Sequence, residues 1–165
     1  MATYGDTARE YPYGIQRPKK QKYSLLTRVI DFTNNLPVTQ GDWQALPENG
    51  NMKGTTAWAA GDVLQAVRIR PGQTVLGVQV EILTRSLDTG DVITVGYGDE
   101  TDRWGRYNLS DSAVVKDTNT HKAQLPDLFW EPKYFSSVDT IDIIIAKAAL
   151  QGKIRLIVHL LEDDR

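Results

Sequence analysis

Apolar and polar positions alternate with a period of two in several separate stretches of this chain, which is the pattern of half-buried β-strands. Residues 74–84 show it most clearly, with four apolar side chains on one face: Leu76, Val78, Val80 and Ile82. Residues 62–70 place Val63, Val67 and Ile69 on one face. The same reasoning predicts strands at residues 24–32, 92–97, 138–146 and 153–161, and a short one at 113–116.

These strands define a candidate core and the turns that connect it. Pro71 and Gly72 occupy the two central positions that a type II turn prefers, and residues 88–91 form the next turn. We expect one face of each later strand to point inward as well, with these residues: Ile93, Val95, Tyr97, Ile141, Ile143, Ile145, Ile154, Leu156, Val158 and Leu160. His159 falls on the outward face of the last strand.

No stretch carries a helical apolar stripe longer than three turns, and residues 146–150 allow one helical turn at most. About six strands joined by turns and by two long loops, 33–61 and 98–136, predict an all-β protein. We expect an antiparallel β-sandwich, jelly-roll-like, with an extended N-terminal arm. An immunoglobulin-like sandwich is the alternative, although the long loops favour the jelly roll.

The N-terminal arm, residues 1–23, shows no strand or helix period and is interrupted by Pro12 and Pro18. The sandwich domain then covers residues 24–165. Residues 1–30 carry an excess of four positive charges, whereas the remainder has a net charge of −6. A basic arm on an acidic body favours adhesion to an acidic surface. We therefore assign partner binding to the basic and aromatic residues of the arm: Tyr11, Tyr13, Arg17, Lys19, Lys20 and Lys22.

Several classes of function lack their residues in this sequence. The chain has no cysteine, which excludes a disulfide framework, a thiolate metal site and a cysteine nucleophile. No apolar run is long enough to span a bilayer, and the first residues do not form a signal peptide. The two histidines, His121 and His159, do not form the His-x-His pair of metal-binding cupins. No nucleotide-binding or hydrolase motif is present, so we expect no enzyme activity, cofactor or tightly bound metal.

Two loop features leave alternatives open. The acidic run at residues 99–102 departs from the calcium-loop pattern, because Arg103 stands at the third ligand position and Trp104 replaces the glycine. A weak calcium site near Asp99 and Asp102 remains an option, as does simple turn formation. Four loop tryptophans, with Tyr107, either pack onto the sandwich or contact a partner or a sugar ring: Trp43, Trp58, Trp104 and Trp130. Packing is the favoured interpretation.

Two segments stand out beyond their strand pattern. The first is AGDVLQAVRIRPGQTVLGVQVEILT at residues 60–84, and the second is VITVGYGDETDRWGRY at residues 92–107. Both resemble segments of small virion structural proteins of tailed bacteriophages. The second departs from the family pattern in having Tyr97 before Gly98 and Asp99, and Trp104 where a small residue is common. The resemblance covers about a third of the chain and implies a β-sandwich that acts as a head decoration or knob-like accessory protein. It implies no catalytic residue.

The expected function is therefore that of a non-enzymatic virion protein, made in the host cytoplasm, that binds the assembled particle through its arm and loops. Its expected partners are the major capsid protein or other virion proteins, with neither a membrane nor nucleic acid bound directly. Bare sandwich edges favour a homo-oligomer, such as a trimer or a set of copies placed by the symmetry of the particle. The alternative function is a carbohydrate-binding module or receptor-binding tip that uses the loop tryptophans.

Overall fold

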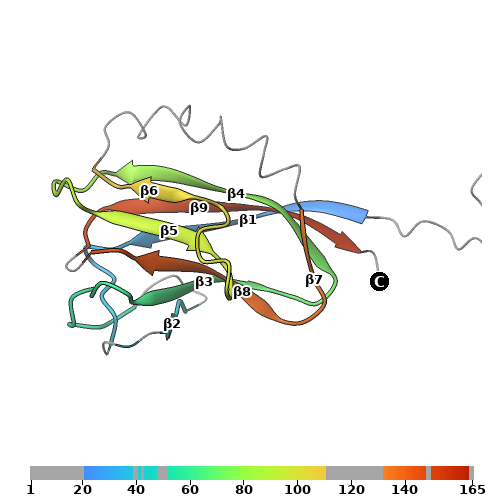
Figure 1. Cartoon of the computed structure of the whole chain (residues 1–165), viewed down its shortest axis with the longest axis horizontal. Helices are drawn as coiled ribbons and strands as arrows, with labels where there is room; N and C mark the ends of the chain where they lie inside the picture. Colours follow the sequence, from blue (N-terminus) through green and yellow to red (C-terminus); the bar gives the residue numbers. More distant parts are fainter. Residues whose placement is uncertain are drawn as a thin grey trace, which may run out of the picture.

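The computed structural model describes residues 21–38, 41, 43–47, 52–110, 132–147 and 150–163. Within these residues the fold consists of nine β-strands (Figure 1): β1 (Gln21–Asp31), β2 (Trp43–Ala45), β3 (Val63–Ile69), β4 (Gln73–Thr84), β5 (Val92–Gly96), β6 (Arg106–Asn108), β7 (Lys133–Phe135), β8 (Asp139–Ile145) and β9 (Lys153–Asp163). None of the described residues is helical. The prediction of an all-β protein is confirmed.

The strands form two sheets, with the order β1-β9-β4-β7 in one and β2-β3-β8-β5-β6 in the other. Every pairing is antiparallel except that of β2 with β3. If β2 is omitted and the other eight strands are numbered 1 to 8 along the chain, one sheet has the order 1-8-3-6 and the other 2-7-4-5. This double-sheet order is that of a jelly roll. The jelly-roll prediction is confirmed, and the immunoglobulin-like alternative is wrong.

The core lies between the sheets and contains the inward faces of the predicted strands. All but one of the eleven central apolar side chains predicted on residues 76–82, 93–95, 141–145 and 156–158 are buried. Leu76 is the exception, since it is half-buried and Val75 points into the core instead. Val63 is likewise half-buried, and Leu64 takes its place.

Both differences have the same cause, which is a β-bulge. In the pairing of β4 with β9, the register shifts between Val75 and Gly77, and in the pairing of β3 with β8 it shifts between Gln65 and Val67. A bulge inserts one extra residue, so the inward-facing set changes from odd to even numbers or back. A strict period of two cannot follow that change.

The sequence and the structure also differ at the strand ends and in the loops. Gln21, Lys22 and Tyr23 are the first residues of β1, so the sandwich begins within the predicted arm of residues 1–23. The three-residue strands β2, β6 and β7 were not predicted, because a period of two has no statistical weight over three residues. The strand predicted at 113–116 lies outside the described residues. Ala146, Lys147 and Leu150, from the predicted helical turn, are not helical.

Candidate functional site

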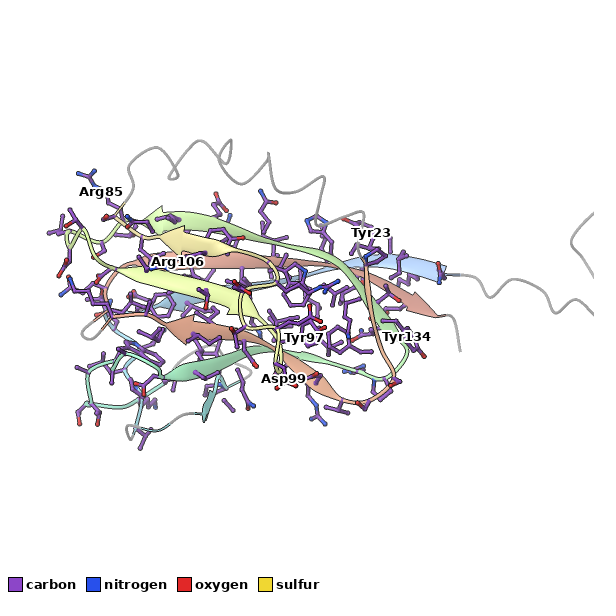
Figure 2. The ribbon with its side chains drawn as sticks, viewed as in Figure 1. Tyr23, Arg85, Tyr97, Asp99, Arg106 and Tyr134 are labelled. Atoms are coloured by element: carbon purple, nitrogen blue, oxygen red, sulfur yellow. The ribbon has the colours of Figure 1, made fainter. Side chains whose placement is uncertain are left out.

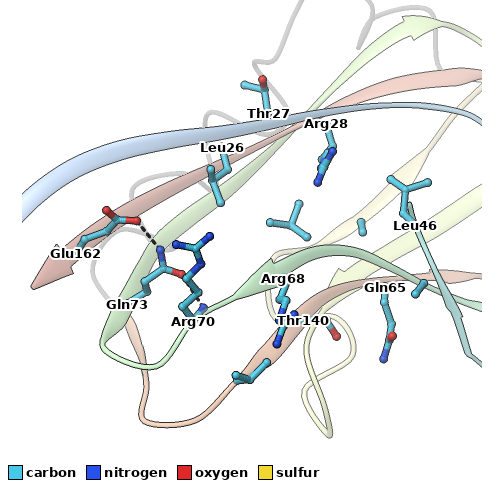
Figure 3. Close-up of a pocket in the computed structure, with 14 residues that line it drawn as sticks. Leu26, Thr27, Arg28, Leu46, Gln65, Arg68, Arg70, Gln73, Thr140 and Glu162 are labelled. Carbon is cyan, nitrogen blue, oxygen red and sulfur yellow. Dashed lines mark hydrogen bonds between the residues drawn. The ribbon is translucent and has the colours of Figure 1, made fainter. Parts of the chain in front are cut away.

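One side of the sandwich is open between the edges of its two sheets. β1 is the edge strand of its sheet, and β2 covers the neighbouring edge of β3 only along Val63, Leu64 and Gln65. A groove of about 860 Å³ follows this side (Figure 3), and its lining comes from both sheets: Leu26, Thr27, Arg28, Ala45, Leu46, Gln65, Ala66, Val67, Arg68, Arg70, Gln73, Val138, Thr140 and Glu162.

Arginine side chains give the groove its charge. Arg28 comes from β1, Arg68 from β3 and Arg70 from the turn between β3 and β4. Glu162 is the only acidic residue among the described residues of the lining. The described lining therefore carries more positive than negative side chains, although the sandwich as a whole is acidic.

The turn between β3 and β4 fixes the position of Arg70. Gly72 has a φ of 87°, the positive value that the second central position of a type II turn requires, so the predicted turn is confirmed. The backbone N–H of Arg70 donates to Oε1 of Gln73 at 2.7 Å. Nε2 of Gln73 in turn donates to Oε1 of Glu162 at 2.5 Å. The turn is thereby attached to the end of β9, and Glu162 already has a hydrogen-bond partner.

A second surface feature lies on the outer face of the four-stranded sheet. Along β1, Tyr23, Leu25 and Val29 are 52%, 50% and 46% exposed. Tyr23 lies opposite Leu161, Leu161 opposite Thr74, and Thr74 opposite Tyr134 of β7. Because directly opposed residues share a face, Tyr23 and Tyr134 mark the two edges of one surface (Figure 2). We call Tyr23, Leu25, Val29 and Tyr134 the outer patch.

His159 lies beneath this patch rather than free on the surface. Its Nδ1 is 2.6 Å from the hydroxyl oxygen of Tyr23, and the two ring centroids are 6.1 Å apart. Burial lowers the pKa of His159 below its ordinary value. The predicted outward direction of this side chain is confirmed, but the histidine is half-buried.

Two of the predicted contact tryptophans belong to the core. Trp58 and Trp104 are each 1% exposed. Trp58 packs edge-on against Phe32, with ring centroids 5.9 Å apart, and Trp104 packs against Tyr97 at 5.5 Å. The hydroxyl of Tyr107 donates to the backbone oxygen of Trp104 at 2.5 Å. A partner or sugar ring cannot reach these side chains, so the contact role predicted for Trp58 and Trp104 is wrong and the packing interpretation is confirmed for both.

The other predicted contact residues are only partly described. Lys22 is exposed on β1, opposite Glu162. Trp43 lies in β2, but its side chain falls outside the described part of the chain. Six further residues also lie outside the described part of the chain: Tyr11, Tyr13, Arg17, Lys19, Lys20 and Trp130. The structure therefore leaves partner binding by the arm as a prediction.

The acidic loop after β5 is held by hydrogen bonds within the chain. The carboxylate of Glu100 accepts a hydrogen bond from the hydroxyl of Tyr97 at 2.5 Å and forms an ion pair with Arg103. These two bonds lower the pKa of Glu100, that from Tyr97 most. Asp99 and Asp102 are exposed. Among the described residues, no three His, Asp or Glu side chains are grouped in a way that would hold a metal ion.

Asp142 is a buried carboxylate on β8 next to this loop. Its Oδ1 accepts a hydrogen bond from the hydroxyl of Thr140 at 2.6 Å, and the backbone N–H of Gly98 donates to the same carboxylate. Burial raises the pKa of Asp142 to about 6, and the negative charge of Asp139 acts in the same direction.

Within the residues that the structure covers, no helix is long and apolar enough to cross a membrane.

Comparisons with known proteins give one structural match. No protein-family model and no curated protein matches the sequence. The fold is similar to a chain in a solved structure described as "Acidic stable capsid structure of Helicobacter pylori bacteriophage KHP30". The match has a TM-score of 0.47 and 14% sequence identity, and it covers 88% of this chain and 93% of that chain.

Proposed function

We propose that this chain is a non-enzymatic structural protein of a bacteriophage particle, where it decorates the assembled shell and contacts the major capsid protein or another virion protein. The outer patch carries this proposal. β1 is an eleven-residue edge strand whose outward side chains include Tyr23, Leu25 and Val29, each about half exposed. Long edge strands with exposed apolar side chains are normally covered by a partner.

Burial of the outer patch against a partner would contribute free energy to binding. Complete burial of a Leu or Val side chain contributes roughly 1.5–3 kcal/mol, so these half-exposed residues would each contribute about half of that. A Tyr side chain suits an interface because its ring is apolar and its hydroxyl is polar. The patch therefore offers a few kcal/mol to a partner.

Two further features support a role in a particle. The patch begins at β1, the strand that follows the basic residues of the arm directly in the sequence, so that arm and patch would reach the same neighbour. Jelly rolls also build viral capsids, although lectins and cupins share the architecture, so fold alone does not decide the function. The resemblance at residues 60–107 favours the virion among these classes. A homo-oligomer, or copies placed by the symmetry of the particle, is part of the proposal.

The test is to sediment phage particles from the lysate of a culture in which both the particles and this protein are produced, and to measure how much of the protein sediments with the particles. We expect the protein to co-sediment with intact particles at a fixed copy number. Replacing Leu25 and Val29 by threonine keeps the strand propensity and removes apolar surface, so the occupancy should fall. Leu87→Thr is the matched control, because Leu87 is 86% exposed but lies far from β1 in the sequence, in the turn after β4. Protein found only in the soluble fraction would overturn the proposal.

A further inference from the structure

We propose that the groove on the open side of the sandwich binds an extended acidic segment of a partner protein, which adds to β1 as a further strand. Leu26 and Arg28 of β1 point into the groove, on the face of the strand opposite Leu25 and Val29 of the outer patch. The inference therefore does not depend on the virion role. It rests on the edge of β1, on the charge opposite that edge and on the shape of the groove.

The hydrogen-bond pattern shows which backbone groups of β1 are directed to the edge. The backbone N–H of Phe32 donates to the oxygen of Gly152 at 2.8 Å, directly after the pair formed by Asp31 and Lys153. Hydrogen-bonded and non-hydrogen-bonded pairs alternate along an antiparallel ladder. Even-numbered residues of β1 are therefore bonded to β9. The N–H and C=O groups of Leu25, Thr27 and Val29 point away from β9, toward an edge along which no described strand pairs.

The wall opposite this edge carries positive charge. Arg68 and Arg70 are both exposed, and neither forms an ion pair with any residue that the structure describes. Both line the groove, as do Leu26 and Arg28 of β1 (Figure 3). Glu162, the one acidic residue in the described part of the lining, accepts a hydrogen bond from Gln73. An arriving segment would therefore need carboxylates on the side that faces the groove.

The groove favours a polypeptide over a nucleic acid. The edge of β1 offers donors and acceptors in alternation, which matches the backbone of another strand. A phosphate chain has only acceptor oxygens, so each edge carbonyl would face an oxygen without a proton between them. Side chains of an added strand alternate between the faces of the sheet. Every second side chain would thus point into the groove that Arg68 and Arg70 line, and these are the positions that we expect to be acidic.

The proposal can be tested by fluorescence anisotropy with a synthetic peptide. The probe is a capped peptide about nine residues long, an ordinary strand length, in which glutamate alternates with threonine. We expect the full-length protein to bind it and the affinity to fall as salt is added. The variant with Arg68→Gln and Arg70→Gln should bind roughly tenfold more weakly or worse, because charge-assisted hydrogen bonds are lost. The matched control is Arg85→Gln with Arg106→Gln, two exposed arginines outside the groove (Figure 2), and should bind normally.

Strand addition has its own variant. Thr27→Pro removes an edge N–H and leaves the hydrogen bonds to β9 in place, so it should reduce peptide binding, whereas Thr27→Val should not. Circular dichroism melting of each variant checks that the sandwich is folded. Equal binding of a peptide with glutamine in place of glutamate would overturn the proposal, as would full affinity in folded Thr27→Pro.

Competing occupants give different results. A single-stranded oligonucleotide that binds where the acidic peptide does not would assign the arginines to phosphate and overturn the proposal. Self-association of the protein that Thr27→Pro abolishes, without peptide binding, would assign the edge of β1 to a second copy and would overturn it too. Loss of the outer patch by Leu25→Thr and Val29→Thr tests particle binding alone. Failure of either proposal is therefore distinguishable from failure of the other.

Discussion

Asp142 shows how the environment of one residue changes its chemistry. It lies on β8 with 2% of its surface exposed, and burial raises its pKa to about 6. Hydrogen bonds from Thr140 and Gly98 offset only part of the loss of hydration. The buried environment destabilises the charged form of Asp142, so the carboxyl group is protonated more readily in the folded state than in the unfolded state. The sequence could not reveal this, because Asp142 stands among residues that read as an ordinary strand.

We predict that Asp142→Asn changes the dependence of stability on pH. The pKa of Asp142 is higher in the folded state than in the unfolded state, so its contribution is fully present below about pH 4 and is lost as the pH rises through 6. Relative to the wild type, the variant should therefore gain roughly 2 kcal/mol in unfolding free energy between pH 4 and pH 7.5. Urea unfolding at both pH values measures this. Parallel pH profiles for the two proteins would contradict the prediction.

The tryptophans show at the same scale what sequence reasoning can and cannot decide. Trp58 and Trp104 were placed in loops, and both rings are buried against Phe32 and Tyr97. Position in a loop says where the backbone runs but not whether the loop folds back over the core. The preference for packing over contact was correct because a large aromatic ring gains more from burial than most side chains do.

At the scale of the strand, the sequence predicts the elements better than it predicts their irregularities. Long strands such as β4 and β9 follow a period of two over most of their length, and their inward faces were predicted from that period. The bulges beside Leu76 and Ala66 were not predictable, because an extra residue leaves no mark in the pattern of apolar positions. The groove was missed for a related reason. The groove exists because β2 pairs with only part of β3. β2 has three residues and is too short to be predicted.

Val80→Asp tests the register of β4. Val80 is fully buried and lies opposite Leu156 in the ladder with β9. An aspartate there would place an unpaired charge between the sheets and should lower the unfolding free energy by several kcal/mol. The matched control is Gln79→Asp on the outer face, which should cost less than about 1 kcal/mol. Equal melting temperatures for wild type and Val80→Asp would show that the register is wrong by one residue.

For the whole molecule, the distribution of charge carries more information than the net charge of −2. The positive excess lies at the start of the chain, before and within β1, while the rest of the sandwich is acidic. The arginine groove is an exception on that acidic body, and only the fold brings Arg28, Arg68 and Arg70 to one recess. Sequence alone predicted the basic arm because its charged residues lie close together in the sequence. It missed the groove because the groove's charges are distant in sequence.

The arm is the part of the chain whose deletion tests attachment most directly. Fixing its residues costs roughly 1–2 kcal/mol each in backbone entropy, so a docked arm needs a large compensating contact. Tyr4, Tyr11, Tyr13 and Ile15 offer too little apolar surface for the arm to fold alone, but tyrosines and basic residues suit a polar, salt-sensitive interface. Deletion of residues 2–20 stops just before β1 and should leave the melting temperature unchanged while binding to particles is lost.

A charge variant separates electrostatic from apolar attachment by the arm. Replacing Arg17, Lys19 and Lys20 by glutamine keeps the length and the tyrosines, so binding should weaken at low salt and lose most of its salt dependence. Occupancy on particles, measured by sedimentation at two salt concentrations, gives both quantities for the wild type, the deletion and the charge variant. If the protein that lacks residues 2–20 occupies particles as fully as the wild type does, the sandwich and not the arm binds the particle. The outer patch and the groove would then be the surfaces to alter, because both lie on or beside β1 and both remain in the deleted protein.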